Sequence, residues 1–320
     1  MRTVKIEKND AGQRLDKFLT KCFKNLPQSL MYKYIRTKHI KLNGKRCQIS
    51  SRLSEGDVVS LYIKDEFFEN KPTEHDFLKA PNKLDIVYED ENIMLVNKPS
   101  GLIVHPGENY HFDSLIARIQ HHLYDKGEYN PESENSFAPA LVNRIDRNTA
   151  GIVIAAKNAE SLRILNDKMK YRELDKLYLC IVHGRLKRKQ DTLEAFLEKN
   201  EKQNRVYISN KPTPNSKTIK TKYKVLDERG NFSLVEIDLL TGRTHQIRAH
   251  MSYIGHPLVG DGKYGTNAQN KSTGYTKQAL CSYKLIFKFT TDSGILEYLN
   301  GKSFEIKDIN FVKDFYSWDK

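Results

Sequence analysis

The chain has 320 residues and carries 53 Lys or Arg against 40 Asp or Glu, for a formal net charge of +13. Hydrophobic residues make up 38% and aromatic residues 10%, more apolar content than a disordered chain carries. No run of about 18 apolar residues occurs, so we expect no membrane-spanning helix. The first ten residues lack the apolar stretch of a signal peptide. The length predicts about two domains.

Four cysteines are spread along the chain and none forms a Cys-x-x-Cys pair: Cys22, Cys47, Cys180 and Cys281. This spacing argues against a zinc ribbon and against a disulfide framework. We therefore expect a cytoplasmic protein in which the cysteines pack as small apolar side chains in a reducing compartment.

The charge is distributed unevenly along the chain. Residues 1–50 carry 13 basic and 3 acidic side chains, residues 51–140 have a net charge of −9, and residues 141–320 have a net charge of +12. Two basic regions separated by an acidic one are the pattern expected of two surfaces that bind the same polyanion. A Lys-rich chain that binds no polyanion explains the charge equally well. The sequence motifs are therefore needed to choose between these two explanations.

The first part of the chain predicts a small domain over residues 1–64. Residues 14–36 have apolar side chains at helical spacing in two short pieces, separated near Pro27. An Asn-Gly pair within residues 40–45 is a strong hairpin signal, and residues 58–63 follow as a strand. The predicted order is helix, helix, hairpin, strand.

Residues 65–83 are polar and acidic with two prolines, which predicts a linker that few packing contacts cross. From residue 84 to 320, strands dominate and follow one another in sequence, which favours an α+β domain with a mixed, mainly antiparallel sheet flanked by helices. The predicted strands are 93–96, 152–156, 177–182, 218–226 and 232–239, and the predicted helices are 113–124, 159–171 and 244–254.

A polar loop at residues 143–151 precedes the buried strand 152–156. Its carboxylate, Asp146, lies between Arg144 and Arg147, and these cations favour the ionised form. An ionised carboxylate at the mouth of a sheet can act as a nucleophile or a base. A turn Asp that caps backbone amides is the simpler explanation for this loop taken alone.

The strand at residues 176–184 has Tyr178, Cys180 and Val182 on one face, because side chains alternate along a strand. Tyr178 taken alone fits an ordinary core aromatic. A tyrosine beside a carboxylate can also stack on a nucleobase.

Residues 240–250 predict a helix that starts at Thr241 and Gly242. Thr244 and Arg248 are four residues apart and would share a face, so Arg248 can point inward toward an anion. A solvated basic helix carrying Arg243 and Arg248 is the alternative. The histidines that follow lack the spacing of a zinc site, and the glycines of residues 260–265 lack the spacing of a phosphate loop.

Taken in order, the segments NRIDRNTAG, KLYLCIVHG and TGRTHQIRAH with GHPLVGD resemble the motifs of the RluA-type pseudouridine synthases. Residues 97–106 resemble the entry strand and turn of that family. Residues 14–63 resemble the S4 RNA-binding module, and this head is closest to the RluC branch, which acts on large-subunit ribosomal RNA. The likeness covers residues 14–63 and 84 to about 290.

The resemblance implies isomerisation of uridine to pseudouridine in RNA, with no cofactor and no metal. Asp146 would be the catalytic carboxylate, Tyr178 would stack on the flipped base, and Arg248 would pair with Asp146. Arg144 would occupy the space that the flipped nucleotide leaves. The RNA contacts implied are seven basic residues: Arg144, Arg147, Lys98, Arg243, Lys33, Arg36 and Lys41.

The chain departs from the family pattern at four places. Asn143 replaces the usual His, Ile145 the usual Leu and Ala150 the usual Ser. Leu-Cys-Ser at residues 280–282 stands where Leu-His-Ala is common.

The resemblance leaves the target open between ribosomal RNA, which we expect, and transfer RNA. A non-catalytic S4-type RNA-binding factor would explain the charge as well, but not the presence of all three motif segments. A hydrolase or ATPase would need a phosphate loop, and a methyltransferase would need a glycine-rich cofactor loop. We expect a monomer whose partner is RNA, with no membrane association.

Overall fold

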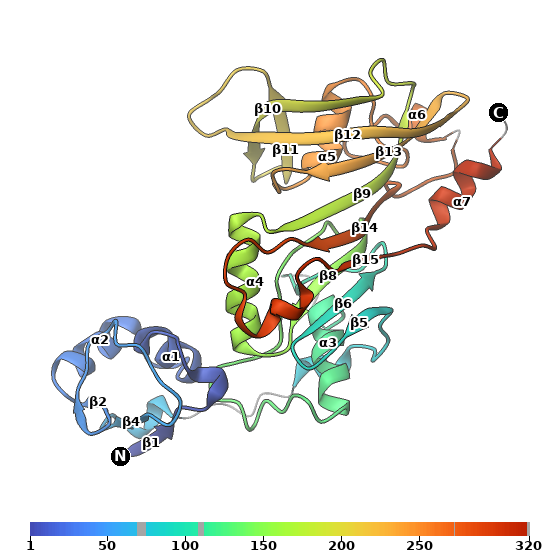
Figure 1. Ribbon diagram of the computed structural model, residues 1–320. Helices are drawn as coiled ribbons and strands as arrows, with labels where there is room; N and C mark the ends of the chain where they lie inside the picture. Colours follow the sequence, from blue (N-terminus) through green and yellow to red (C-terminus); the bar gives the residue numbers. More distant parts are fainter. Residues whose placement is uncertain (69–74, 108–111, 272, 319–320) are drawn as a thin grey trace.

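The computed structural model describes residues 1–68, 75–107, 112–271 and 273–318 (Figure 1). Residues 69–74, the middle of the predicted linker, lie outside the described residues. On either side of them the chain forms short 3-10 helices, η2 (Asp65–Phe67) and η3 (Asp76–Lys79). No helix in the described ranges is long and apolar enough to cross a membrane.

The head consists of two helices packed on an antiparallel sheet with the strand order β1-β4-β2-β3. Its elements are β1 (Arg2–Lys5), η1 (Lys8–Asp10), α1 (Leu15–Cys22), α2 (Gln28–Arg36), β2 (Ile40–Leu42), β3 (Lys45–Arg46) and β4 (Val58–Leu61). The helices, the hairpin and the last strand are as predicted from sequence. Strand β1 was missed, because its four residues become a strand only by pairing with β4.

The rest of the chain forms one 11-stranded mixed sheet. The order along it is β11-β10-β12-β13-β9-β14-β8-β6-β5, with β15 on β14 and β7 on β8. The strands are β5 (Ile86–Glu89), β6 (Ile93–Lys98), β7 (Ala140–Leu141), β8 (Ala150–Ala156), β9 (Leu174–His183), β10 (Gln190–Asn200), β11 (Arg205–Ser209), β12 (Lys217–Arg229), β13 (Phe232–Leu239), β14 (Leu280–Phe287) and β15 (Ser303–Glu305). Its neighbours pair antiparallel except β14 and β8, which run parallel.

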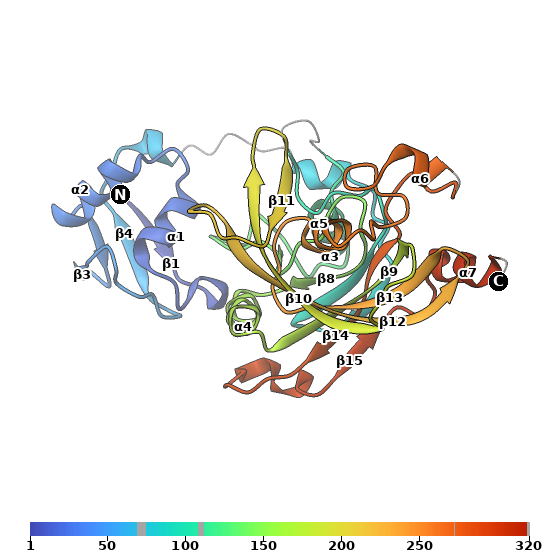
Figure 2. The same ribbon diagram turned by 90° about the horizontal axis from the view of Figure 1, so that it is seen from above.

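Helices cover both faces of this sheet, and the strands therefore carry apolar side chains on both sides. The helices are α3 (Leu115–Asp125), α4 (Ala159–Tyr171), α5 (Gln246–Tyr253), α6 (Asn267–Lys271), η4 (Gly294–Leu299) and α7 (Asn310–Ser317). Helices α3 and α5 pack on one face, and α4, η4 and α7 pack on the other (Figure 2). The predicted alternation in β9 is confirmed: Tyr178, Cys180 and Val182 join the α3–α5 core, and Leu179 and Ile181 join the opposite one.

A close approach between β8 and β14 brings the motif segments together. Gly151 in β8 has φ +118° and lies opposite Ser282 of β14. A Cβ at Gly151 would come within 2.3 Å of the Ser282 carbonyl oxygen, so only glycine fits this position. Strand β14 also pairs with β9, where Ser282 lies opposite Tyr178. The start of β8 and the middle of β9 therefore lie on either side of one strand.

The head lies beside α4 as a separate lobe (Figure 1). Its hydrophobic core shares no buried residue with the cores of the sheet domain. The contacts that cross between the two are polar. Asp10 is 1% exposed and accepts hydrogen bonds from Ser136 Oγ at 2.6 Å and Asn135 Nδ2 at 2.7 Å. Arg163 of α4 donates to the Ala11 carbonyl at 2.9 Å. More contacts cross than the predicted linker led us to expect.

Candidate active site

Asp146 lies in the loop between β7 and β8, with its side chain about a quarter exposed. The loop is anchored by the buried side chain of Ile145 and by a turn in which the Thr149 N–H donates to the Asp146 carbonyl at 3.0 Å. Asn143 Oδ1 accepts the Ile154 N–H at 2.8 Å, so the residue that replaces the usual His holds the loop against β8. The partner of the Asp146 carboxylate is a side-chain cation rather than a backbone amide, so the capping explanation is wrong.

That cation is Arg248, which donates from Nη1 to Asp146 Oδ2 at 2.9 Å. The predicted pairing is thus present, and it joins residues 102 positions apart in sequence. The sequence predicted Arg144 and Arg147 as the cations beside Asp146, whereas the cation hydrogen-bonded to its carboxylate is Arg248. Arg144 and Arg147 are both exposed, and Arg147 Nε donates to the Gly101 carbonyl at 3.1 Å.

Arg248 has a second and stronger partner that the sequence analysis did not assign, Asp261. Nε donates to Asp261 Oδ2 at 2.7 Å and Nη2 donates to Asp261 Oδ1 at 3.0 Å, a bidentate pair. Asp261 is 0% exposed, and burial opposes its ionisation. The hydrogen bonds and charge of Arg248 outweigh burial and hold the pKa of the Asp261 carboxyl below its ordinary value.

The same ion pairs raise the pKa of Arg248. Burial of the guanidinium lowers it, but the hydrogen bonds and charges of Asp261 and Asp146 outweigh burial. In the sequence, Asp261 ends the segment GHPLVGD and lies between two glycines, but neither feature assigned it to Arg248. Gly260 has φ +77°, and a Cβ there would lie 2.1 Å from the Lys277 carbonyl oxygen, so this turn requires glycine.

Helix α5 begins at Gln246, two residues after the start of the predicted range 244–254 and four after Gly242. Gln246 is buried and its Oε1 accepts from Thr241 Oγ1 at 2.9 Å and from the Arg243 N–H at 3.1 Å, which fixes the preceding residues as a loop. Thr244 is therefore outside the helix and shares no helical face with Arg248. Arg248 points inward because the whole first turn of α5 is buried. Arg243 is exposed.

Lys98 is completely buried at the end of β6, which corrects the expectation of a direct RNA contact. Its ammonium donates to the carbonyls of Pro99 and Leu102 at 2.8 Å and of Arg147 at 2.9 Å. Three protein acceptors use all three of its donors. Burial lowers the pKa of Lys98 to about 7, against the opposing charge of Asp146. Lys98 thus braces the loop of Asp146 from beneath.

Tyr178 is 6% exposed and packs within the α3–α5 core. Burial raises the pKa of Tyr178 to about 12; a hydrogen bond with Ser282 lowers it, and the charge of Asp146 adds to the increase. The tyrosine is a core residue that also lies within electrostatic range of the carboxylate. Its packing is that of a core aromatic, and stacking on a base stays a prediction.

The remaining predicted RNA contacts lie on the head. Lys33 and Arg36 are exposed on α2, and their spacing of three residues puts them on one face of the helix. Lys41 on β2 is half-buried, with Nζ 5.3 Å from the centre of the Tyr62 ring.

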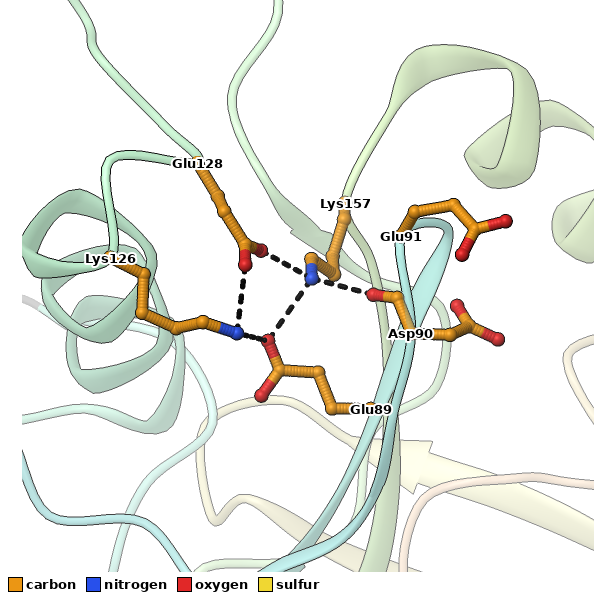
Figure 3. Close-up of a pocket in the computed structure, with 6 residues that line it drawn as sticks. All are labelled: Glu89, Asp90, Glu91, Lys126, Glu128 and Lys157. Atoms are coloured by element: carbon orange, nitrogen blue, oxygen red, sulfur yellow. Dashed lines mark hydrogen bonds and ion pairs between the residues drawn. The ribbon is translucent and has the colours of Figure 1, made fainter.

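A second cluster of charges lines a pocket of about 640 Å³ at the far end of β8 (Figure 3). Lys157 donates to Glu89 at 3.0 Å and also pairs with Glu128. Burial of Glu89 is outweighed by hydrogen bonds from Lys126 and Lys157, which lower its pKa to about 2. Residue 157 follows β8 and residue 146 precedes it, so the two sites are roughly 20 Å or more apart. The mutual pairing of these side chains indicates a structural network.

Comparisons with known proteins agree with the motifs. Residues 92–253 match the family model described as RNA pseudouridylate synthase, and residues 13–59 match the S4 domain. The chain is 34% identical over 270 residues to the ribosomal large subunit pseudouridine synthase C of Vibrio cholerae, covering 82% of this chain and 80% of that one. It is 35% identical over 314 residues to an RNA pseudouridine synthase of Mycoplasma capricolum, covering 93% and 94%.

Two solved human structures share the fold. RNA pseudouridylate synthase domain containing 4 superposes with a TM-score of 0.57 at 21% identity, covering 72% of this chain and 91% of that one. RNA pseudouridylate synthase domain containing 1 superposes with a TM-score of 0.54 at 20% identity, covering 78% and 99%.

Replacing Arg248 with Met should leave two carboxylates without their cation. Loss of one partner from a buried pair typically costs about 3–5 kcal/mol in the free energy of unfolding. Because Asp261 is fully buried and Asp146 is a quarter exposed, most of the loss should come from Asp261. The measurement is the free energy of unfolding in urea. Relative to Arg248→Met alone, the double variant with Asp261→Asn should therefore regain more stability than the double variant with Asp146→Asn.

The control for this cycle is Arg188→Met, which removes a solvent-exposed pair with Asp191. It should cost less than about 1 kcal/mol. Equal recovery by the two double variants would show that Asp261 is not the main counter-ion of Arg248.

Proposed function

The chain belongs to the RNA pseudouridylate synthase family, and from this premise we propose that it isomerises uridines of large-subunit ribosomal RNA, with Asp146 as the catalytic carboxylate. The N1–C1′ bond breaks, the uracil turns, and C5 bonds to C1′. The product has the same atoms and oxidation state as the substrate. The balance of the reaction therefore requires neither a redox partner nor an energy source.

The observation that carries this proposal is the way the Asp146 carboxylate is held. Arg248 Nη1 lies 2.9 Å from Oδ2, and His245 Nε2 approaches the same oxygen at 3.8 Å. Within the part of the chain that the structure describes, no hydrogen bond reaches Oδ1. One oxygen is thus held by the protein, and the other is free to meet a nucleotide. A carboxylate serving only as a structural counter-ion would not need this asymmetry.

A uridine inside a folded RNA can reach Asp146 only if it leaves its stack. We infer that the extruded base meets the ring of Tyr178, which packs in the core near Asp146 with 6% of the residue exposed. Arg144 is exposed on the same loop and can enter the space that the nucleotide vacates. The exposed Arg147 and Arg243 flank this region with charges that suit phosphates, while Lys98 acts indirectly by holding the loop.

The ribosomal target rests on the relatives named as synthases of the large subunit. Transfer RNA is the second candidate target, because the charged head and the site could bind either kind of RNA. Chemical mapping of pseudouridine in ribosomal and transfer RNA, from cells with and without this protein, separates the two. Loss of a ribosomal modification alone supports the proposal, and loss of a transfer RNA modification alone contradicts it. A monomer in the cytoplasm remains our expectation.

Asp146→Asn should abolish pseudouridine formation and leave RNA affinity nearly unchanged. The amide cannot replace the negative charge at Oδ1, whereas affinity depends mainly on phosphate contacts. The measurement is conversion of target RNA under single-turnover conditions together with a binding titration. Asp167→Asn, an exposed carboxylate on α4, is the control. Substantial conversion by Asp146→Asn would remove this residue from the chemistry.

Tyr178→Leu should lose most of the activity, since stacking on a base is worth about 1–3 kcal/mol. Tyr178→Phe keeps the ring and should retain much of the RNA affinity. Thermal unfolding of each variant separates a loss of packing from a loss of stacking. The exposed Tyr171 supplies the control variant Tyr171→Leu. RNA affinity equal to wild type in Tyr178→Leu would favour a purely structural tyrosine.

Simultaneous replacement of Lys33, Arg36 and Lys41 with Ala should weaken RNA binding and flatten its dependence on salt. If each side chain neutralises one phosphate, the slope of log affinity against log salt should fall by roughly 2, at about 0.7 per contact on single strands. The matched control replaces three exposed lysines near the C-terminus, Lys302, Lys307 and Lys313. An unchanged slope in the head variant would remove α2 and β2 from the RNA interface.

A further inference from the structure

His245 is buried between the proposed catalytic carboxylate and a tyrosine. Its Nε2 lies 3.8 Å from Asp146 Oδ2, and its Nδ1 lies 2.9 Å from the hydroxyl of Tyr264. The side chain is 10% exposed. The contact of His245 with Asp146 has been described, but no role has yet been assigned to its other nitrogen or to Tyr264, whose backbone N–H donates to Asp261 Oδ1 at 3.1 Å.

We infer from the hydrogen bonds of Tyr264 which imidazole nitrogen carries the proton. Its hydroxyl oxygen accepts the backbone N–H of Val206 at 3.0 Å. Its own proton is then available for Nδ1 of His245, which acts as the acceptor. A neutral histidine has one donor and one acceptor nitrogen, so Nε2 carries the hydrogen and directs it at Asp146. Burial lowers the pKa of His245, against the charge of Asp146, which favours this neutral form.

Tyr264 also connects the site to the hairpin β10–β11. The Val206 N–H that holds its hydroxyl belongs to β11, and Arg205 of the same strand lies over its ring at 5.2 Å. The guanidinium of Arg248 lies at the same distance from the ring. Lys263 adds a hydrogen bond to the Asn204 carbonyl, in the hairpin turn, at 2.7 Å. The turn that carries Asp261 and Tyr264 is therefore tied to the hairpin at several points.

We propose that His245 is a positioning residue that directs its Nε2–H at Asp146 Oδ2, in a tautomer fixed by Tyr264, which in turn is held by strand β11. This inference rests on the proposed role of Asp146. Arg248 and His245 would approach one oxygen from two directions, so that the carboxylate cannot rotate and Oδ1 faces the nucleotide. The present 3.8 Å is longer than a hydrogen bond, as is common for catalytic contacts before substrate binds.

A purely structural histidine makes the opposite prediction from a positioning one. His245 precedes α5 with φ +52°, in the left-handed region that Asn tolerates better than most residues. Asn also places its amide near the position of Nδ1, where it can accept from Tyr264. Gln extends further and places an N–H donor near the position of Nε2. A structural role therefore favours Asn over Gln, whereas positioning of Asp146 favours Gln over Asn.

The test compares His245→Gln, His245→Asn and His245→Ala in the full chain by single-turnover conversion of target RNA and by RNA affinity. Removing the donor should lower the rate about 10- to 100-fold, because small misplacements of reacting groups have effects of that size. We expect this loss of rate in His245→Asn and His245→Ala and a smaller loss in His245→Gln. RNA affinity should be unchanged in all three variants. Tyr253→Phe, on the exposed end of α5, is the control. A rate for Asn equal to or above that for Gln overturns the proposal.

A second measurement does not depend on activity. The ¹⁵N resonances of His245 in the free protein should show a protonated Nε2 and an unprotonated Nδ1, and Tyr264→Phe should mix the two tautomers. A protonated Nδ1 in the wild type overturns the proposal even if every variant is slow. If the resonances are as expected but the wild-type protein forms no pseudouridine in any RNA, the proposed function fails while the hydrogen-bond assignment stands.

Discussion

The site depends on one buried guanidinium shared unequally between two carboxylates. Arg248 gives Asp261 two hydrogen bonds and Asp146 one. Removing a charge from water is costly, and the bidentate partner with no exposure offsets that cost for Arg248. The single bond to Asp146 then aims the second carboxylate without neutralising it. With one cation between two anions, the group keeps a net negative charge, which is what a catalytic carboxylate requires.

The Arg248 group differs from the cluster around Glu89 in whether both oxygens of its carboxylates have a protein partner. There, Glu89 is held by Lys126, Lys157 and His122, and Glu128 also pairs with both lysines. Such a network ties together β5, β8 and the end of α3, and both oxygens of Glu89 have a partner within it. At Asp146 one oxygen is left without a protein donor among the described residues. Shifted pKa values occur at both places, so the unmatched oxygen distinguishes a reactive site from a structural one.

The sheet supplies the rigidity on which this geometry depends. Asp146 precedes β8, Tyr178 lies within β9, and β14 runs between these two strands, parallel to one and antiparallel to the other. Gly151 and Gly260 mark the points where backbones approach too closely for any side chain. Beneath the loop, the ammonium of Lys98 binds three carbonyls, one of them from Arg147 next to Asp146. The loop is therefore held from below by Lys98 and from the side by Arg248, and its open side faces outward.

Local sequence determined the elements whose pattern is complete within a short segment. The helices of the head, its Asn-Gly hairpin and strand β9 with its alternating faces could be identified, because side-chain period and residue type are properties of the segment itself. For Asp146, Tyr178 and Arg248 the local patterns left simpler explanations open, and only the family resemblance of three motifs in order singled these residues out. Among the described residues, seven strands were missed: β1, β5, β7, β10, β11, β14 and β15. Most of them are short or polar and become strands only by pairing within a sheet, whereas β14 is eight residues long and largely buried, and its sequence was not recognised as a strand. The burial of Lys98, the role of Asp261 and the start of α5 at Gln246 were decided by tertiary structure alone. The energy of a buried charge depends on which groups surround it, and those groups come from β6, α5 and two loops that only the folded chain brings together.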